Sequence, residues 1–277
     1  MVYKLQRLGF CAVLDQAIAI SRDHFRLLFS LTLVLEAPFL LIFGVWAQTA
    51  VPPPPVNPTP EESMRYLVQV FGGLPHIILG FIGYMLIVWP LTKAMLIRAI
   101  ALLYLSEPVS FVEIIKHTLR HCLPVLITWT LMFTIFAIGF VCCMLPVVPL
   151  YLLFGLAQIV TVVEGVAGPA ALGRSFRLAS PHWLTFLGVM FFTFVIAYAL
   201  QVMPNLIPQG FLQVAVSTLV SSVLSVFATA TTVVFYFSCR CAVEYFDLYH
   251  LAKSIRVEPL ALVELGDGVA TLNYDAS

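Results

Sequence analysis

The chain alternates between long apolar segments and short polar ones. Each apolar segment has about the length of a membrane-spanning helix, which needs about 20 mostly apolar residues. Six such segments lie at residues 27–49, 68–92, 123–144, 147–165, 183–203 and 211–238. Because lipid offers the backbone no hydrogen-bond partners, the segments are predicted to be helices.

A shorter amphipathic segment precedes the first and third of these helices. The first has an apolar stripe of Phe10, Leu14, Ala17, Ile18, Ser21 and Phe25. The second opens with Ser110-Phe111-Val112-Glu113, which predicts a capping box. Its predicted apolar face is Phe111, Val112, Ile115, Leu119 and Cys122. Helices of this kind lie in the headgroup region with their apolar side toward the lipid.

A third short helix is predicted before the fifth span, in the segment VVEGVAGPAALGRSFRLASPHWL. Gly168 suits the cap of this helix and Pro169 its first position, and the helix is expected to end near Leu178. The predicted fold is therefore an all-α integral membrane protein. Its six transmembrane helices form three hairpins, each preceded by a cytoplasmic amphipathic helix. Residues 1–255 are expected to form one membrane domain, and residues 256–277 a short acidic cytoplasmic tail.

The positive charges predict how the helices are oriented. All of the 14 Lys and Arg residues except Arg65 fall on one side of the six predicted spans. Because positive residues concentrate on the cytoplasmic side, we expect both termini in the cytoplasm. The expected location is the cell (inner) membrane, with the bilayer as the first partner.

Composition agrees with a membrane protein and argues against several other classes. The chain is 61% hydrophobic and 10% charged, whereas soluble domains are typically about 25% charged. Its formal net charge of +0 favours no nucleic-acid partner. The common hydrolase, metalloprotease, P-loop and dinucleotide-binding motifs are absent from the sequence. We therefore expect no enzyme activity and no cofactor.

Three parts of the sequence resemble the glycerophosphoryl diester phosphodiesterase membrane-domain family and its YciC-like relatives. They are FCAVLDQAIAISRDHFRLLFSLTLVLE, VVEGVAGPAALGRSFRLASPHWLTFLG and VVFYFSCRCAVEYFDLYHLA. The last is similar to the family's closing pattern, carried here by Tyr236, Arg240, Glu244, Asp247 and Leu248. Ser238 and Ala242 depart from it, since the family often has Asp and Arg there.

The resemblance implies a six-span membrane protein whose activity is mostly undefined. Some relatives carry a separate phosphodiesterase barrel after the membrane part, which needs roughly 200–250 residues. Here a tail of about 20 residues follows Arg256, so the hydrolase activity is not expected.

Two polar residues lie inside predicted spans. Glu36 falls near the middle of the first span, just before Pro38. An intramembrane carboxylate is a functional candidate by default, and it needs a partner, for which Gln158, Thr130 and Thr92 are candidates. A structural hydrogen bond that stabilises the Pro38 kink is the favoured interpretation, and a proton-relay or solute-pathway role is the alternative. Glu36 and Gln158 form the candidate intramembrane site.

A second group of charged residues falls near the predicted cytoplasmic boundary. Its members are Arg98, Glu164, Arg174, Arg177, Arg240 and Glu244. We expect Arg174 and Arg177 to lie beside Glu164 or Glu244. The group is predicted either to fasten the helix ends or to bind anionic lipid headgroups.

Histidines provide a weaker metal hypothesis. His24, His121 and His182 each precede an outward-going span, and three imidazoles suit zinc or copper. His117 and His121 are also one helical turn apart. Amphipathic side chains at a membrane boundary are the favoured explanation of both patterns, so no metal site is assigned.

Two functions fit these observations. The first is a non-enzymatic scaffold or accessory protein that packs with lipids or partner membrane proteins. The alternative is a small carrier or channel for a solute or lipid, with Glu36 on its pathway. Carriers usually have broken helices and several polar residues at midplane, and the few polar residues here favour the scaffold.

The predicted orientation can be tested by labelling. In intact cells, a cysteine at Val56, in the proline-rich loop, should react with an impermeant reagent, and a cysteine at Ala270 should not. The reason is that the positive charges place the loop outside and the tail inside. Labelling of the tail without the loop would contradict the orientation.

Overall fold

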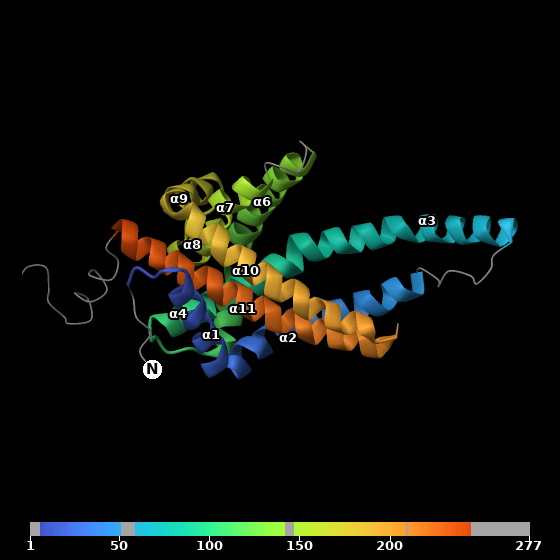
Figure 1. Cartoon of the computed structure of the whole chain (residues 1–277), viewed down its shortest axis with the longest axis horizontal. Coiled ribbons are helices and arrows are strands. Elements are labelled where there is room, and N and C mark those ends of the chain that lie inside the picture. The colour runs from blue at the N-terminus through green and yellow to red at the C-terminus, as the bar shows by residue number, and fades with distance from the viewer. Residues whose placement is uncertain (1–5, 51–58, 142–146, 209, 245–277) are drawn as a thin grey trace, which may run out of the picture.

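The computed structural model describes residues 6–50, 59–141, 147–208 and 210–244 (Figure 1). Within these ranges every regular element is a helix, so the all-α prediction is confirmed. The Pro52–Pro55 loop and the tail at 256–277 lie outside the described residues.

The elements follow one another in this order: α1 (Phe10–Asp23), α2 (Phe25–Ala50), α3 (Pro60–Gly83), the π-helical η1 (Tyr84–Val88), α4 (Trp89–Tyr104), α5 (Phe111–Arg120), α6 (Cys122–Val141), α7 (Val147–Phe154), α8 (Ala157–Glu164), α9 (Pro169–Ala179), the 3-10 helix η2 (Ser180–His182), α10 (Trp183–Val202), the 3-10 helix η3 (Met203–Leu206) and α11 (Phe211–Glu244).

Among the described residues, five helical segments are long and apolar enough to cross a membrane. They are Phe25–Trp46, Glu61–Tyr104, Cys122–Phe140, Pro169–Leu206 and Phe211–Glu244. The predicted span at 147–165 is instead divided into α7 and α8, of 8 residues each. They meet at Gly155, where an added Cβ would lie 2.6 Å from the carbonyl oxygen of Tyr151. A single spanning helix in this segment is therefore not confirmed.

Helix α11 is the centre of the bundle. It packs against α1, α2, α4, α9 and α10, and in its C-terminal half nearly every residue from Thr229 to Cys239 is buried. In its N-terminal half only a narrow stripe is buried, which includes Thr218 and Ser222. Small side chains on such a stripe allow close packing of membrane helices. α2 approaches it at Gly44, where a Cβ would lie 2.6 Å from Val214.

The run from α3 to α4 is continuous but changes its hydrogen-bond register at η1. The Trp89 N–H donates to the Tyr84 carbonyl, five residues back. In that register the Met85 carbonyl would accept from residue 90, but Pro90 has no N–H to donate. The indole Nε1 of Trp129 on α6 donates to the Met85 oxygen instead, at 2.6 Å. Proline thus explains both the π-helical segment and its contact with α6.

The turn between α8 and α9 forms as the sequence predicts. Gly165 and Gly168 have positive φ angles of 74° and 65°, Gly168 is the N-cap of α9, and Pro169 occupies its first turn. The Thr128 hydroxyl on α6 accepts the Gly168 N–H at 2.9 Å. α9 ends at Ala179, one residue beyond the predicted end.

One local prediction for α5 is wrong. Ser110 is its N-cap, but the Ser110 side chain makes no capping hydrogen bond. Water can satisfy the first N–H groups there, because Val112 and Glu113 are exposed. The buried residues of α5 are Ile114 and Thr118. Val112 and Leu119, expected on the apolar face, are exposed, which is compatible with a face that lies toward lipid.

Only part of the apolar stripe predicted for α1 is buried. Leu14 and Ala17 are buried, while Ile18 and Phe25 are exposed. α1 packs mainly against α11, so it belongs to the protein core along one face. This packing, rather than lipid alone, decides which of its apolar residues are buried.

Candidate functional site

Glu36 is bound by a residue that the sequence did not single out. Its side chain is 2% exposed, and the Tyr84 hydroxyl donates to Glu36 Oε1 at 2.7 Å. Gln158, Thr130 and Thr92 were expected as partners, and the structure does not place them there. The first residue of η1 is Tyr84, so the irregular segment caused by Pro90 also contributes the partner of Glu36.

Lys93 points into the bundle beside Glu36. Its ammonium donates to Thr229 Oγ1 at 2.9 Å and to the Ser225 carbonyl at 3.4 Å, and it lies 4.8 Å from the centre of the Trp89 ring. Thr229 precedes Arg240 on α11 by about three turns, roughly 16 Å at 1.5 Å per residue. If Arg240 marks the membrane boundary, the ammonium is near mid-depth, since the hydrocarbon core is about 30 Å thick.

The lysine takes this position for a geometric reason. Side chains on an α-helix lean toward its N-terminus, and Lys93 is on the second turn of α4. Its stem therefore leads back over Trp89 and η1, toward the Tyr84–Glu36 pair. In the sequence, Lys93 falls on the cation-rich side of the spans, and nothing there predicts this direction.

A cavity of about 720 Å³ surrounds these groups, and we call it the Glu36–Lys93 cavity. It extends along α11 from Ser221 to Thr232. Its other walls are mostly apolar side chains of α6, α7 and α10. This volume is within the range of small-molecule sites, which is about 300–1,000 Å³.

Two buried polar atoms beside the cavity lack hydrogen-bond partners among the described residues. They are Glu36 Oε2 and Ser225 Oγ, and both residues line the Glu36–Lys93 cavity. Leaving a buried polar atom unsatisfied costs about 1–3 kcal/mol, and more for a charged group. Their shared position marks the cavity as the place where a polar ligand group would be stabilised.

Gln158, the second predicted intramembrane residue, faces the same cavity. It is 6% exposed, and its Nε2 donates to the Pro90 carbonyl at 2.8 Å. Both Glu36 and Gln158 thus line one cavity, although each has its own hydrogen-bond partner, Tyr84 and the Pro90 carbonyl. The two residues are connected through the irregular segment between α3 and α4, because Tyr84 binds Glu36 and the nearby Pro90 carbonyl accepts from Gln158.

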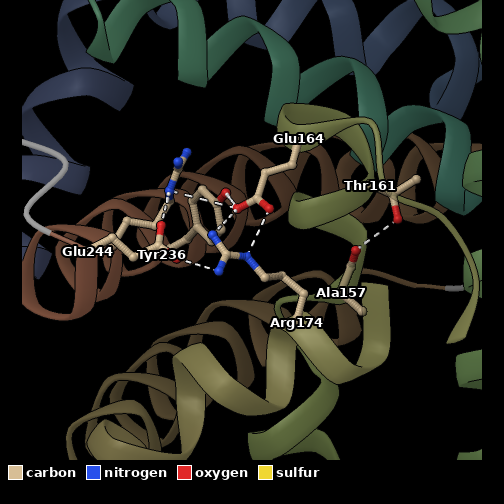
Figure 2. A network of polar contacts seen from close by, with 7 residues as sticks. Ala157, Thr161, Glu164, Arg174, Tyr236 and Glu244 are labelled. Carbon is tan, nitrogen blue, oxygen red and sulfur yellow. Dashed lines mark hydrogen bonds and ion pairs between the residues drawn. The ribbon is translucent and has the colours of Figure 1, made fainter. Parts of the chain in front are cut away.

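A separate ion network joins α8, α9 and α11 (Figure 2). Glu164 accepts from Arg174 Nε at 2.9 Å and from the Tyr236 hydroxyl at 2.6 Å. Arg174 also pairs with Glu244. Arg240 lies 3.2 Å from Glu244 and 3.8 Å from Glu164. Two carboxylates and two guanidinium groups therefore balance one another.

Two of the six residues grouped by sequence lie outside this network. Arg177 was expected beside Glu164 or Glu244 and has no ion pair among the described residues. It is exposed because the buried side of α9 is formed by residues such as Ser175 and Leu178. Arg98 lies instead near His117. Burial lowers the pKa of His117, and the positive charge of Arg98 lowers it further.

Two of the three segments that carry the resemblance meet in this network. Tyr236, Arg240 and Glu244 of the closing pattern all contact Glu164 or one another; Asp247 and Leu248 lie outside the described residues. Ser238, which departs from the pattern, has another role. Its hydroxyl oxygen accepts the Leu8 N–H at 2.8 Å and so ties the segment before α1 to α11.

The histidines are not brought together as a metal site. No group of three His, Cys, Asp or Glu side chains in the described part of the chain is placed to hold a metal, and this covers His24, His121 and His182. His117 and His121 stack with their ring centres 4.2 Å apart. The ring nitrogen Nδ1 of His121 lies 3.0 Å from the His117 carbonyl.

Comparison with models of known protein families, with curated proteins and with solved structures gives no match to this chain.

Arg174 is part of the ion network and Arg177 is not, so the two arginines of α9 should contribute unequally to stability. Arg174→Gln should lower the free energy of unfolding by about 1–3 kcal/mol, because it leaves two partly buried carboxylates with one guanidinium; a fully buried pair would lose about 3–5 kcal/mol. Arg177→Gln removes the same charge from an exposed position and should change stability by less than about 0.5 kcal/mol. Unfolding in mixed micelles measures both. Equal effects would contradict the network.

Proposed function

We propose that this chain is a multi-pass membrane protein that binds an amphipathic small molecule in the Glu36–Lys93 cavity and acts as a carrier for it. The observation that carries the proposal is the pair of buried polar atoms without described partners, Glu36 Oε2 and Ser225 Oγ. Both residues line a cavity of ligand size that also contains the Lys93 ammonium. The proposal assigns no enzyme activity.

Two interrupted helical runs and one proline inside a helix support a carrier. α2 contains Pro38 two residues after Glu36, η1 interrupts the run from α3 to α4, and Gly155 separates α7 from α8. Irregular backbone at membrane depth is tolerated where it is buried in protein or lines a cavity. Transporters build their sites from such interrupted helices. Here Glu36, Tyr84 and Gly155 all line the Glu36–Lys93 cavity.

The ligand is proposed to enter sideways from the bilayer. Val148 on α7 and Phe191 and Phe194 on α10 line the cavity, and they are also 56%, 67% and 66% exposed. These side chains therefore face both the cavity and the surroundings of the protein. A molecule with an apolar part would reach the cavity between α7 and α10 without crossing water.

The proposed orientation has both termini in the cytoplasm of a cell (inner) membrane. α7 and α8 together would provide the sixth crossing, which gives three hairpins preceded by α1, α5 and α9. Figure 1 shows α1, α9 and the end of α11 toward one end of the molecule, away from the start of α3. The positive charges favour that end as cytoplasmic. Arg98 and Arg177, outside the ion network, would face anionic lipid headgroups there.

The scaffold remains the competing proposal, and the family resemblance is compatible with both. A scaffold needs fixed helix ends, which the network of Glu164, Arg174, Arg240 and Glu244 would provide. It needs no ligand in the Glu36–Lys93 cavity. The two proposals therefore differ in one property: whether the cavity has an occupant.

Ala228→Phe tests occupancy by filling the cavity, because Ala228 lines it. The measurement is quenching of tryptophan fluorescence in vesicles by phospholipids with brominated chains. Trp46→Phe and Trp183→Phe leave Trp89 and Trp129, which line the cavity, as reporters. Ala228→Phe should weaken the apparent affinity of the quenching site by roughly tenfold, about 1.4 kcal/mol.

Val223→Phe is the matched control. It adds the same ring to the same helix, at a residue that is 39% exposed and does not line the cavity. It should leave the quenching unchanged. If the tryptophans of both Ala228→Phe and Val223→Phe are quenched as in the parent protein, the cavity has no lipid-like occupant and the scaffold is favoured.

A further inference from the structure

We infer that the ligand of the Glu36–Lys93 cavity is a zwitterionic lipid, whose polar group carries an ammonium and an anionic oxygen and no net charge. The inference rests on the proposed function and specifies its ligand. It follows from how charge and hydrogen-bonding capacity are distributed along the cavity wall.

The cavity is balanced in charge. One acidic side chain, Glu36, and one basic side chain, Lys93, line it, and the two attract each other electrostatically. They are not joined as an ion pair in the described part of the chain, and both line the same cavity. An unpaired charge in a low-dielectric interior is costly. A ligand with net charge would leave one charge uncompensated, whereas a zwitterion would not.

The cavity has both an unused hydrogen-bond acceptor and an unused donor. Glu36 Oε2 is an acceptor without a described partner. Lys93 has three N–H groups, and two contacts, to Thr229 and to the Ser225 carbonyl, are described. The Ser225 hydroxyl adjoins them without a partner. A ligand ammonium would donate to Glu36, and a phosphate or carboxylate oxygen would accept from Lys93 and Ser225.

The remaining wall suits a hydrocarbon chain. Away from Glu36 and Lys93 the lining includes Leu187, Met190 and Phe191 on α10, together with Met132 on α6. A small zwitterion without a tail would leave this apolar surface uncovered. A chain in contact with it would gain about 25 cal/mol for each Å² removed from water, and it would extend toward the proposed opening between α7 and α10.

The test compares three brominated single-chain probes with the same tail. Their polar groups are phosphoethanolamine, which is zwitterionic, phosphoglycerol, which is anionic, and a primary amine, which is cationic. Quenching of Trp89 and Trp129 reports binding, in the background used above. In the parent protein the phosphoethanolamine probe should bind most tightly, by roughly tenfold over each charged probe.

Charge variants should then change the preference in opposite directions. Glu36→Gln removes the negative charge that balances Lys93, so the phosphoglycerol probe should gain affinity relative to the amine. Lys93→Gln removes the positive charge that balances Glu36, so the amine probe should gain affinity relative to the phosphoglycerol probe. Two control variants, Glu113→Gln and Lys116→Gln, make the same charge changes at exposed positions and should leave the order of the probes unchanged.

The outcomes separate the inference from the proposed function. If all three probes bind equally well and Ala228→Phe weakens each of them, the cavity binds amphiphiles but the zwitterion assignment is wrong. A charged probe that binds most tightly to the parent protein overturns the assignment as well. If Ala228→Phe affects none of the probes, the proposed function itself fails. The comparison in the parent protein decides even if a charge variant does not fold.

Discussion

Inside a bilayer, every polar group must find its partner within the protein, and this constraint explains most of the structure. Proline removes a donor at Pro90, and the indole of Trp129 reaches from α6 to the Met85 carbonyl that is left without one. Gln158 reaches from α8 to the Pro90 carbonyl in the same way. Two side chains from other helices thus hold one irregular segment, and that segment contributes Tyr84 to Glu36. The packing of four helices follows from satisfying these groups.

The described part of the chain has two clusters of charge inside the helical bundle, and they satisfy this constraint to different degrees. In the network of α8, α9 and α11, each of the four charged side chains contacts at least one of opposite sign. In the Glu36–Lys93 cavity, a carboxylate oxygen and a hydroxyl have no described partner. A network in which every charged side chain is paired fixes the helices and leaves no unpaired charge for a ligand. An unsaturated pair beside an apolar cavity is stabilised when a ligand arrives, which is why we place function there.

Features that depend on local chemistry could be predicted from the sequence. Long apolar segments predicted the helices, and Gly168 and Pro169 predicted the start of α9, because capping depends on a few neighbouring residues. Glu36 could be singled out because a carboxylate is costly in an apolar segment. The division of α7 from α8 was missed, although Gly155 lies within the segment, since the close contact with Tyr151 follows only from the folded backbone.

Features that depend on packing could not be predicted. Tyr84 becomes the partner of Glu36 only after Pro90 changes the helix register, and one tyrosine in an apolar segment carries no signal of this. Arg174 and Arg177 are equivalent in the sequence, yet the rotation of α9 against α8 and α11 brings Arg174 alone to the carboxylates. The direction of Lys93 likewise depends on Thr229, which lies far away along the chain.

The central claim is that the Glu36–Lys93 cavity is occupied in the working protein. Native mass spectrometry of the protein, purified from its membrane and released from the mildest detergent that keeps it folded, tests this directly. The account predicts a population with one bound lipid of zwitterionic headgroup, and its loss on Ala228→Phe but not on Val223→Phe. A bare protein under conditions that preserve the fold, or an adduct equally abundant in both variants, would contradict it.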